Sequence, residues 1–585
     1  MIARTDPTFL AVSRGDEEAD LVVANAGVVN VFTRCVEPRS IVIHGGRIAA
    51  LVRDDKGVRA RDRVEAKGRL ALPGFIDAHV HIESMMLPPS ACANLVVAHG
   101  TTGLVADPHE VGNVAGVPGI HWMMDDAKAA PIRIWFTASS CVPASNLETA
   151  AATLASDDLA PLFDDPRVIA LAEMMNFPGT IAGDPSIMAK VALGLERRGR
   201  VDGHAPGLRG GRLQTYIAAG PSSDHESFTV EEAAEKLALG QRVFIREGSA
   251  ARNLLALLPL VTPANAHRVC FCTDDVHAFE AAEDGHLDRV IRRAAAQGFD
   301  GPTAVAMASL HVAEHFGLRD HGAIAPGMAA DFSLARTARG DWSDLTIDQT
   351  WVDGRVVAEG GRCTAPATTI PVSACLLRTV KLAKGLNERS FETSARERVP
   401  ARVVGIVPGQ IVTTDLREVP RVERGILCAD PSRDLLLLAS IESHGKNGGI
   451  GLGLVRGFGL REGAIASTVG HDAHNLSVAG VSRADMLVAA RRLEELGGGQ
   501  CIAAGGKVLA ELPLPLAGLL SDQPASAVAA RQHEMQKAYE SLGGTLADPF
   551  MQLAFLPLSV IPSLKVSDCG IIDVNRFAIV PLQDP

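Results

Sequence analysis

Apolar and polar residues follow two different rhythms along this chain. Between residues 19 and 71, short Val- and Ile-rich runs are separated by turn sequences such as Asn-Ala-Gly and His-Gly-Gly, a pattern that predicts a small antiparallel β unit. The same pattern returns between residues 322 and 361. We expect these two distant segments to pair into one β-sandwich, with the intervening residues inserted between them.

The insert, from residue 74 to about residue 320, has a different texture. Apolar runs such as TTGLVA, VIALAEM and RVCFC alternate there with helix-like stretches such as VEEAAEKLALG. This alternation is typical of repeated βα units, and its length suits a (β/α)8 TIM-like barrel. Such a barrel keeps its chemistry at the carboxyl ends of its strands, and polar residues crowd those positions here.

The remainder of the chain predicts a further unit. After a linker at residues 364–371, alternating strands, Gly-rich turns and a long helix indicate an α+β domain. Its glycine clusters do not complete a nucleotide-binding motif, so we interpret them as tight turns. The predicted fold class is therefore α/β, with a β-sandwich from residues 1–73 and 321–371, a barrel over 74–320 and a C-terminal domain over 372–585.

Composition narrows the function classes. The chain has 585 residues, of which 47% are hydrophobic and 21% charged, as is typical of a globular protein. Its net charge of −12 disfavours binding to nucleic acid or anionic lipid and favours a small, weakly charged ligand. The apolar runs are shorter than the roughly 18 residues of a membrane helix, and the N-terminal segment lacks the features of a secretory signal. With ten scattered cysteines, we expect reduced thiols and a cytoplasmic protein.

The strongest local motif is PGFIDAHVHIES, residues 73–84. In a strand of alternating pattern, His79 and His81 project on the same side, so that two imidazoles converge as a metal site requires. An isolated HxH is a weak signal, because two such histidines can equally face solvent or pack at a strand end. Here the pair ends the first predicted barrel strand.

Four more residues of metal-ligating type stand at predicted strand ends. His204 and His225 each follow a strand-like or turn segment at the spacing of βα units. Asp274 closes the run RVCFCTDD, and Glu173 ends the run VIALAEMM. A lone histidine in such a place is more often structural. Because barrel closure brings distant strand ends to one face, the six residues together predict a metal site.

This arrangement resembles the amidohydrolase superfamily, with HxH on strand 1, a bridging acid on strand 4, histidines on strands 5 and 6 and an aspartate on strand 8. Many members that hydrolyse cyclic amides bridge their metals with a carboxylated lysine on strand 4. This chain has no lysine between Lys128 and Lys190. The resemblance therefore implies Glu173 as the bridge and points away from hydantoinases and dihydroorotases.

The chain is still more similar to the adenine deaminase family. The motifs TTGLVADPHEVGN, LAEMMNFPG, DGHAPGL, SSDHES, IREGSAARN, CTDD, HDAHN and PFMQLAFLPLSVIPSLK occur in that order and span nearly the whole chain after residue 19. The resemblance implies hydrolytic deamination of adenine to hypoxanthine and ammonia, by a hydroxide that bridges two divalent metal ions. The implied ligands are His79, His81, Glu173, His204, His225 and Asp274.

The same resemblance favours manganese, with iron or zinc as alternatives, and implies a role in purine salvage. It also implies a preference for the free purine base over the nucleoside, and we expect a homo-oligomer, taken as a dimer. Two alternatives remain: another amidohydrolase that acts on a different nucleobase or a cyclic amide, and a non-catalytic scaffold. The complete ligand set argues against the scaffold.

Proton transfer requires acids near the metal ions. In this superfamily the residue at the position of Asp274 commonly combines ligation with proton acceptance. Asp107 and Glu110 follow strand 2 and Glu247 follows strand 7, so we expect all three carboxylates at the barrel mouth. For Asp107 and His109, a helix N-cap and a supporting hydrogen bond are equally good interpretations.

A last cluster lies in the predicted C-terminal domain. The sequence VGHDAHN places His471, Asp472 and His474 within four residues. They could bind metal or form a lid over the purine, and solvated loop residues are the alternative. We favour a lid, because such polar groups are costly to bury without partners. Glu83 completes an HxE sequence with His81, but no PCxxC follows it, so we interpret Glu83 as a supporting residue.

Overall fold

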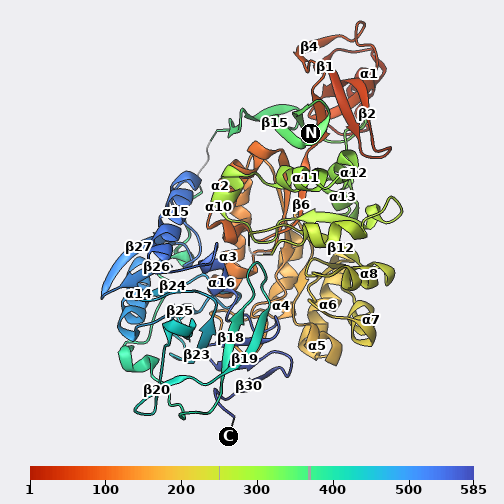
Figure 1. Cartoon of the computed structure of the whole chain (residues 1–585). Coiled ribbons are helices and arrows are strands. Elements are labelled where there is room, and N and C mark those ends of the chain that lie inside the picture. The colour runs from red at the N-terminus through yellow and green to blue at the C-terminus, as the bar shows by residue number, and fades with distance from the viewer. Residues whose placement is uncertain (250, 367–369, 585) are drawn as a thin grey trace.

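The structure is a computed structural model that describes residues 1–249, 251–366 and 370–584. Residues 367–369 of the predicted linker lie outside the described residues, as does Ala250 in the IREGSAARN motif. Figure 1 shows the N-terminal strands at one end of the molecule, the βα units in the middle and the C-terminal strands at the other end.

Eight parallel strands form the described part of the middle region. They are β6 (Phe75–Val80), β7 (Thr101–Ala106), β8 (Arg133–Ala138), β9 (Val168–Met174), β10 (Val201–Gly203), β11 (Ser223–Asp224), β12 (Arg242–Arg246) and β13 (Val269–Cys272). Strands β6 to β10 make one parallel sheet and β11 to β13 make another. The sheets meet at both edges, through a bridge between Val80 and Asp274 and a 2.9 Å hydrogen bond from the Ser222 N–H to the Val201 carbonyl. The region is therefore a mixed α/β, TIM-like unit.

Burial explains the many apolar residues in these strands. Every residue of β6, β7 and β9 is buried, as expected for parallel strands that helices cover. The helices of this region are α2 (Pro89–Val96), α3 (His109–Asp126), α4 (Ser156–Leu159), α5 (Phe177–Ala182), α6 (Pro185–Arg198), α7 (Gly210–Ala219), α8 (Val230–Ala238), α9 (Leu254–Leu257), α10 (Ala278–Glu283), α11 (Leu287–Ala296), α12 (Gly301–Met307) and α13 (Leu310–Phe316). Side chains cap several of them, for example Asp184 on α6 and Thr229 on α8.

The two distant β-rich segments share one nine-stranded sheet. Strand β5 pairs antiparallel with β14, so that Pro73 lies opposite Phe332. The sheet contains β1 (Ala19–Asn30), β2 (Cys35–His44), β3 (Arg47–Val52), β4 (Ala60–Glu65), β5 (Leu70–Pro73), β14 (Phe332–Ala338), β15 (Asp341–Val352), β16 (Arg355–Glu359) and β17 (Arg362–Cys363). Helix α1 (Pro7–Arg14) precedes it. The pairing of the two segments is confirmed, with the βα region inserted between them. The strands pair within one sheet, and their arrangement as a β-sandwich stays a prediction.

The C-terminal region is built on a second large sheet. Its eight strands are β18 (Ala401–Ile406), β19 (Thr413–Glu418), β22 (Leu436–Ile441), β23 (Ile450–Arg456), β24 (Ala464–Ser467), β25 (Leu476–Gly480), β26 (Gly499–Ala504) and β27 (Lys507–Pro513). Smaller sheets contain β20 (Arg421–Glu423), β21 (Ile426–Cys428), β28 (Leu564–Ser567), β29 (Gly570–Asp573) and β30 (Ala578–Val580). The helices are α14 (Arg483–Leu496), α15 (Ala525–Ser541) and α16 (Pro549–Ala554).

The C-terminal region is packed onto the barrel rather than tethered beside it. One continuous apolar core contains Val80 and Phe136 of the barrel together with Leu438 and Leu514 of the C-terminal region. Polar contacts cross the same boundary, such as the 2.8 Å hydrogen bond from the Ser521 N–H to the Met86 carbonyl. This packing holds the loop after β24 over the carboxyl ends of the barrel strands. Across the described ranges, no helix has both the length and the apolar character needed to cross a membrane.

Candidate metal centre and active site

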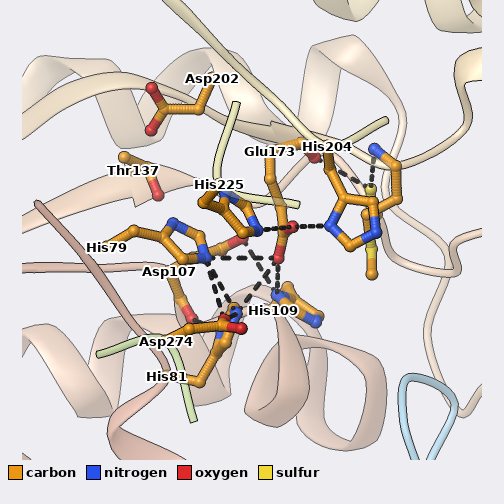
Figure 2. Close-up of polar contacts among 12 residues, drawn as sticks. His79, His81, Asp107, His109, Thr137, Glu173, Asp202, His204, His225 and Asp274 are labelled. Carbon is orange, nitrogen blue, oxygen red and sulfur yellow. Dashed lines mark hydrogen bonds and ion pairs between the residues drawn. The ribbon is translucent and has the colours of Figure 1, made fainter. Parts of the chain in front are cut away.

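The six predicted metal ligands lie in one buried cluster at the carboxyl ends of the barrel strands (Figure 2). Glu173, at the end of β9, contacts three histidines from other strands. Its Oε1 atom is 3.2 Å from His81 Nε2, and its Oε2 atom is 3.2 Å from His225 Nε2. The same Oε2 atom accepts a hydrogen bond from His204 Nδ1. The carboxylate therefore occupies the central position that a bridging ligand needs.

Asp274 closes the cluster from the opposite side. Its Oδ1 atom is 3.2 Å from His81 Nε2 and 3.5 Å from His79 Nε2. The residue follows β13 and has a left-handed backbone, with φ of 59°, a conformation that is strained for a non-glycine residue and common at functional sites. The backbone N–H of Asp274 donates to the His79 carbonyl at 2.9 Å. Strand closure thus sets the position of this carboxylate.

The ring nitrogens in the cluster have the arrangement that metal ligands require. His79 Nε2 and His81 Nε2 face each other at 3.1 Å, and His81 Nδ1 is 3.3 Å from the Asp107 carbonyl oxygen. A proton on that Nδ1 atom leaves the lone pair of His81 Nε2 pointing into the cluster. His225 Nε2 is buried and finds no hydrogen-bond partner among the described residues, and His204 faces Glu173 with its Nδ1 atom.

Several groups of these residues have ligand atoms within 4.8 Å of one another, including His79 with Glu173 and His225, and His79 with His81 and Asp274. Mixed imidazole and carboxylate donors without thiolate suit divalent zinc, iron or manganese. The residues therefore fit the divalent ions that the ligand pattern predicts.

Opposing charges keep both acids of the cluster ionised. Burial alone would raise the pKa of Asp274, but the Arg246 guanidinium and the rings of His79 and His81 hold it well below its usual value. Burial would likewise raise the pKa of Glu173, and the charge and hydrogen bond of His204 lower it well below that range. Carboxylates bind metal cations in their ionised form, so both acids are in the form that a metal ligand needs.

A second group of polar side chains joins the barrel to the C-terminal region. His109 lies between two carboxylates: its Nδ1 atom is 3.0 Å from Asp107 Oδ2, and its Nε2 atom is 3.3 Å from Asp472 Oδ1. Burial would lower the pKa of His109, but Asp107 and Asp472 raise it well above the usual value. The same ring reaches the cluster, because His109 Nδ1 is 3.8 Å from Glu173 Oε1.

The lid candidates are buried and contact the barrel. His471 Nδ1 is 3.0 Å from Glu110 Oε1, and the His471 ring stacks on Phe555 with centroids 4.4 Å apart and planes 10° apart. Despite burial, the charge of His471 lowers the pKa of Glu110 to about 2. His474 Nδ1 accepts the Gly470 N–H at 3.2 Å, and burial lowers the pKa of His474 to about 3. His474 is therefore neutral, with its proton on Nε2.

The Glu247 carboxylate has its partners outside the cluster, whereas its neighbour Arg246 contacts an acid of the cluster. The Glu247 carboxylate pairs with Arg293 at 2.8 Å and accepts the Leu254 N–H at 3.1 Å, so it is committed outside the cluster. Arg246 instead donates to Asp274 Oδ2 at 2.6 Å and is bonded to Glu226. Neither Arg246 nor Glu226 was predicted as a site residue, although both are adjacent in sequence to residues that were.

Glu83 and Asp275 are buried acids beside the site. Glu83 Oε1 accepts the Val111 N–H at 3.3 Å, and burial together with the charge of Glu110 raises the pKa of Glu83 to about 8. Asp275 accepts a hydrogen bond from the Ser84 hydroxyl, and burial with the charge of Asp274 raises the pKa of Asp275 to about 6. These positions agree with a supporting role for Glu83.

One small cavity joins the two groups of residues. The barrel and the C-terminal region both line it, with His81, His109, Glu173, Met175, His204, Glu226, Arg246, Asp274 and Asp275 from the barrel and Ile411, His471, Asp472, Phe555 and Leu558 from the C-terminal region.

The apolar part of the lining has its own support. Lys565 is fully buried, and its Nζ atom donates to the carbonyls of Ile411 at 3.0 Å and Phe555 at 2.9 Å. Both acceptor residues line the cavity. Burial lowers the pKa of Lys565 to about 7. Lys565 ends the motif PFMQLAFLPLSVIPSLK, but no role for it followed from the sequence, because its partners are two backbone carbonyls and one of them, that of Ile411, is far away along the chain.

The fold and the cluster together define a class of protein. A parallel α/β barrel whose strand ends carry these imidazoles and carboxylates is a metal-dependent hydrolase of the amidohydrolase type, and residues 70–357 match the amidohydrolase family. Residues 410–578 match the adenine deaminase C-terminal domain.

Full-length relatives narrow the class. The chain is 44% identical over 577 residues to an adenine deaminase of Desulfatibacillum aliphaticivorans, a match that covers 99% of both chains. It is 44% identical over 569 residues to an adenine deaminase of Cereibacter sphaeroides (97% of this chain and 98% of the other), and 42% identical over 578 residues to one of Dehalococcoides mccartyi (98% and 99%). The chain belongs to the adenine deaminase family.

Proposed function

We propose that this chain catalyses the hydrolytic deamination of adenine to hypoxanthine and ammonia. The observation that carries the proposal is the single cavity that members of the metal-type cluster line on one side and Ile411, Asp472 and Phe555 line on the other. Those last three residues lie in the part of the chain that matches the adenine deaminase C-terminal domain. The cavity thus has residues of the metal-type cluster on the barrel side and residues of the adenine deaminase C-terminal domain on the other side.

The six clustered residues would hold two divalent ions, with Glu173 between them. More ligands are available than the four that one tetrahedral ion uses, and Glu173 contacts histidines on both sides. Manganese is the ion that family resemblance favours, with iron or zinc as alternatives. When bound, such ions supply the nucleophile by making water acidic near neutral pH.

The remaining residues of the chain handle protons and orientation. Adenine must gain a proton on the ring and lose ammonia from C6. Asp274 is held ionised by Arg246, as a proton acceptor must be. His109, flanked by Asp107 and Asp472, lines the cavity in the protonated form and can deliver a proton to the base or to the leaving amine. Glu110 holds His471 in place, and Glu247 is left out of this set because Arg293 occupies its carboxylate.

The division of labour follows the predicted organisation of the chain. We assign the ligands to the barrel over residues 74–320 and the cover of the cavity to the C-terminal domain over residues 372–585, with residues 1–73 and 321–371 as the β-rich support. His471, Asp472 and His474 are then the part of the cover that touches the site. Their burial and their contacts with Glu110 and His109 support this assignment.

The main alternative is an amidohydrolase that acts on a different nucleobase or on a cyclic amide, since fold alone does not determine substrate. The test uses the full chain reconstituted with Mn²⁺ and measures turnover of adenine, guanine, adenosine and hydantoin, with elemental analysis of the same sample. We expect the highest kcat/KM with adenine and about two ions per chain. A higher kcat/KM with guanine or hydantoin would support the alternative, and an active sample with a single ion would contradict the metal pair.

A further inference from the structure

The carboxylates that line the cavity differ in whether their oxygen atoms have donors. Glu226 is bonded to Arg246, and Asp275 accepts a hydrogen bond from Ser84. Glu173 and Asp274 belong to the metal-type cluster. Asp472 is the exception. Both of its oxygen atoms are buried; Oδ1 faces the His109 ring at 3.3 Å, whereas Oδ2 has no hydrogen-bond donor among the residues that the structure describes.

The surroundings of Asp472 favour its ionised form. The Oδ1 atom lies 3.3 Å from His109 Nε2 and 3.7 Å from His471 Nδ1. Burial opposes ionisation, but these two imidazoles lower the pKa of Asp472 below its usual value. An ionised carboxylate can only accept hydrogen bonds. A buried acceptor of this kind needs a donor from whatever occupies the cavity, because leaving it unmatched is costly.

Asp472 also lies beyond the cluster rather than within it. The His109 ring separates the two, with Nδ1 3.8 Å from Glu173 Oε1 and Nε2 3.3 Å from Asp472 Oδ1. A base whose C6 atom faces the cluster would therefore direct a different edge toward Asp472. The apolar side chains of Ile411 and Phe555 line the same cavity and suit the flat faces of a heterocycle.

The donors of adenine are few. The free base carries N–H groups at two places only, the exocyclic amine on C6 and the N–H of the five-membered ring. The proposed reaction holds the amine at the metal-type cluster. All other ring nitrogens are acceptors, which an ionised carboxylate would repel. Only the N–H of the five-membered ring can satisfy Asp472.

We propose that Asp472 is the specificity residue of this site and accepts the five-membered-ring N–H of a free purine base. A nucleoside carries its sugar on that ring, at N9, so it lacks the N–H group and leaves the buried Oδ2 atom of Asp472 without a donor. The C-terminal region would then select the form of the substrate while the barrel performs the chemistry. This inference rests on the proposed function for the orientation of the base.

The kinetic test compares adenine with 9-methyladenine, which lacks the N–H and is much smaller than a nucleoside. Wild-type enzyme loaded with Mn²⁺ should prefer adenine by about 100-fold or more in kcat/KM, the value of a lost hydrogen bond to a charged group. Asp472→Ala removes the acceptor and leaves room for the methyl group, so the preference should fall below about 5-fold, mainly through a lower kcat/KM for adenine. Asp472→Asn, which keeps a neutral acceptor of the same shape, should lie between the two.

A matched control and a binding measurement separate the possible failures. Asp568 is a buried acid at the same boundary that contacts Thr149 and Asn475, so Asp568→Asn should change both substrates by the same factor. Calorimetry with hypoxanthine and 9-methylhypoxanthine measures the preference without turnover. If the wild type does not deaminate adenine, the proposed function fails, and the calorimetric ratio still tests Asp472. A preference that stays at the wild-type value in both Asp472 variants, with metal content intact, would overturn the inference.

Discussion

The two sides of the cavity are built by different means. On the barrel side, the six ligand-type residues come from the ends of parallel strands, and ladder hydrogen bonds hold them, such as the one between Asp274 and His79. On the C-terminal side, His471 and Asp472 lie in a loop after β24, and Phe555 follows the short helix α16. The positions of these residues depend on side-chain contacts such as those with Glu110, His109 and Lys565.

This difference indicates that the barrel side carries out the reaction and that the C-terminal side determines which substrate binds. Residues at barrel strand ends are held by the closed sheet, so they keep ligand geometry even when loops change. Loop residues can change without loss of the ligands, and they determine what shape and which donors the cavity accepts. We therefore expect changes on the barrel side to remove metal and activity together, and changes on the C-terminal side to alter kinetics while metal remains.

The largest effect should follow Glu173→Gln on the barrel side. The neutral amide removes the charge that faces His81, His204 and His225. We expect kcat/KM for adenine to fall by more than about 100-fold. Substitution of residues that only support metal ligands already lowers metal affinity or activity by about 10- to 100-fold. Elemental analysis should show a matching loss of bound metal.

Glu247→Gln is the matched control, because this acid is also buried at a strand end but pairs with Arg293. It should keep its metal content and lose less than about 10-fold in kcat/KM. An effect as large as that of Glu173→Gln would return Glu247 to the catalytic set.

His471→Ala tests the C-terminal side. The substitution removes the partner of Glu110 and the ring that stacks on Phe555. We expect kcat/KM for adenine to fall by about 10- to 100-fold, since a buried carboxylate loses a charged partner, while about two ions per chain are retained. His533→Ala is the control, because His533 is 46% exposed and contacts only Glu283 among charged partners in the described chain. Loss of metal in His471→Ala would contradict the separation of the two sides.

Lys565→Met should have a smaller effect on the same side. Two carbonyls, of Ile411 and Phe555, lose their donor, so the apolar lining shifts. We expect KM for adenine to rise by about 3- to 10-fold, with kcat less affected and metal retained. Lys565→Arg should restore part of the loss. A change in kcat alone would argue against a positioning role.

The pH dependence of stability gives Lys565 a second signature. Its folded pKa of about 7 is lower than that of a free lysine, about 10.4, so the unfolded chain binds more protons between these values. The wild type should therefore gain stability relative to Lys565→Met as the pH rises from 7 to 10, by about 1.4 kcal/mol for each pH unit at most. Thermal unfolding midpoints measured in parallel at pH 6.5, 8 and 9.5 would check the sign.

The smallest effect concerns His277, which joins the barrel to the C-terminal region. Its Nε2 atom lies 2.6 Å from Asp548 Oδ2, and this carboxylate, against the effect of burial, raises the pKa of His277 to about 9. The pair should stabilise the fold fully below the usual pKa of about 6.5 and lose that contribution as the pH rises through 9. His277→Asn should lower the midpoint by about 1–3 °C at pH 6 and by nothing measurable at pH 10.5. The opposite slope would show that the ion pair is absent in solution.

Much of the barrel side could be predicted from the sequence, because its logic is local. A residue after a buried parallel strand points to one rim of a barrel whatever the loops do, so His79, Glu173 and Asp274 could be placed together without coordinates. Glu247 shows the limit of this rule. It follows β12 as expected, yet Arg293 from α11 determines where its carboxylate lies.

What the sequence by itself determined is the order of elements, the pairing of the two β-rich segments and the set of ligand types at the strand ends, because each depends on short-range periodicity or strand order. Only the tertiary structure decided which residues contact the C-terminal side of the cavity. His109 meets Asp472, and Lys565 meets Ile411, across long stretches of chain. Such pairs depend on how two separately formed regions bury their apolar faces against each other, and no local pattern records that packing.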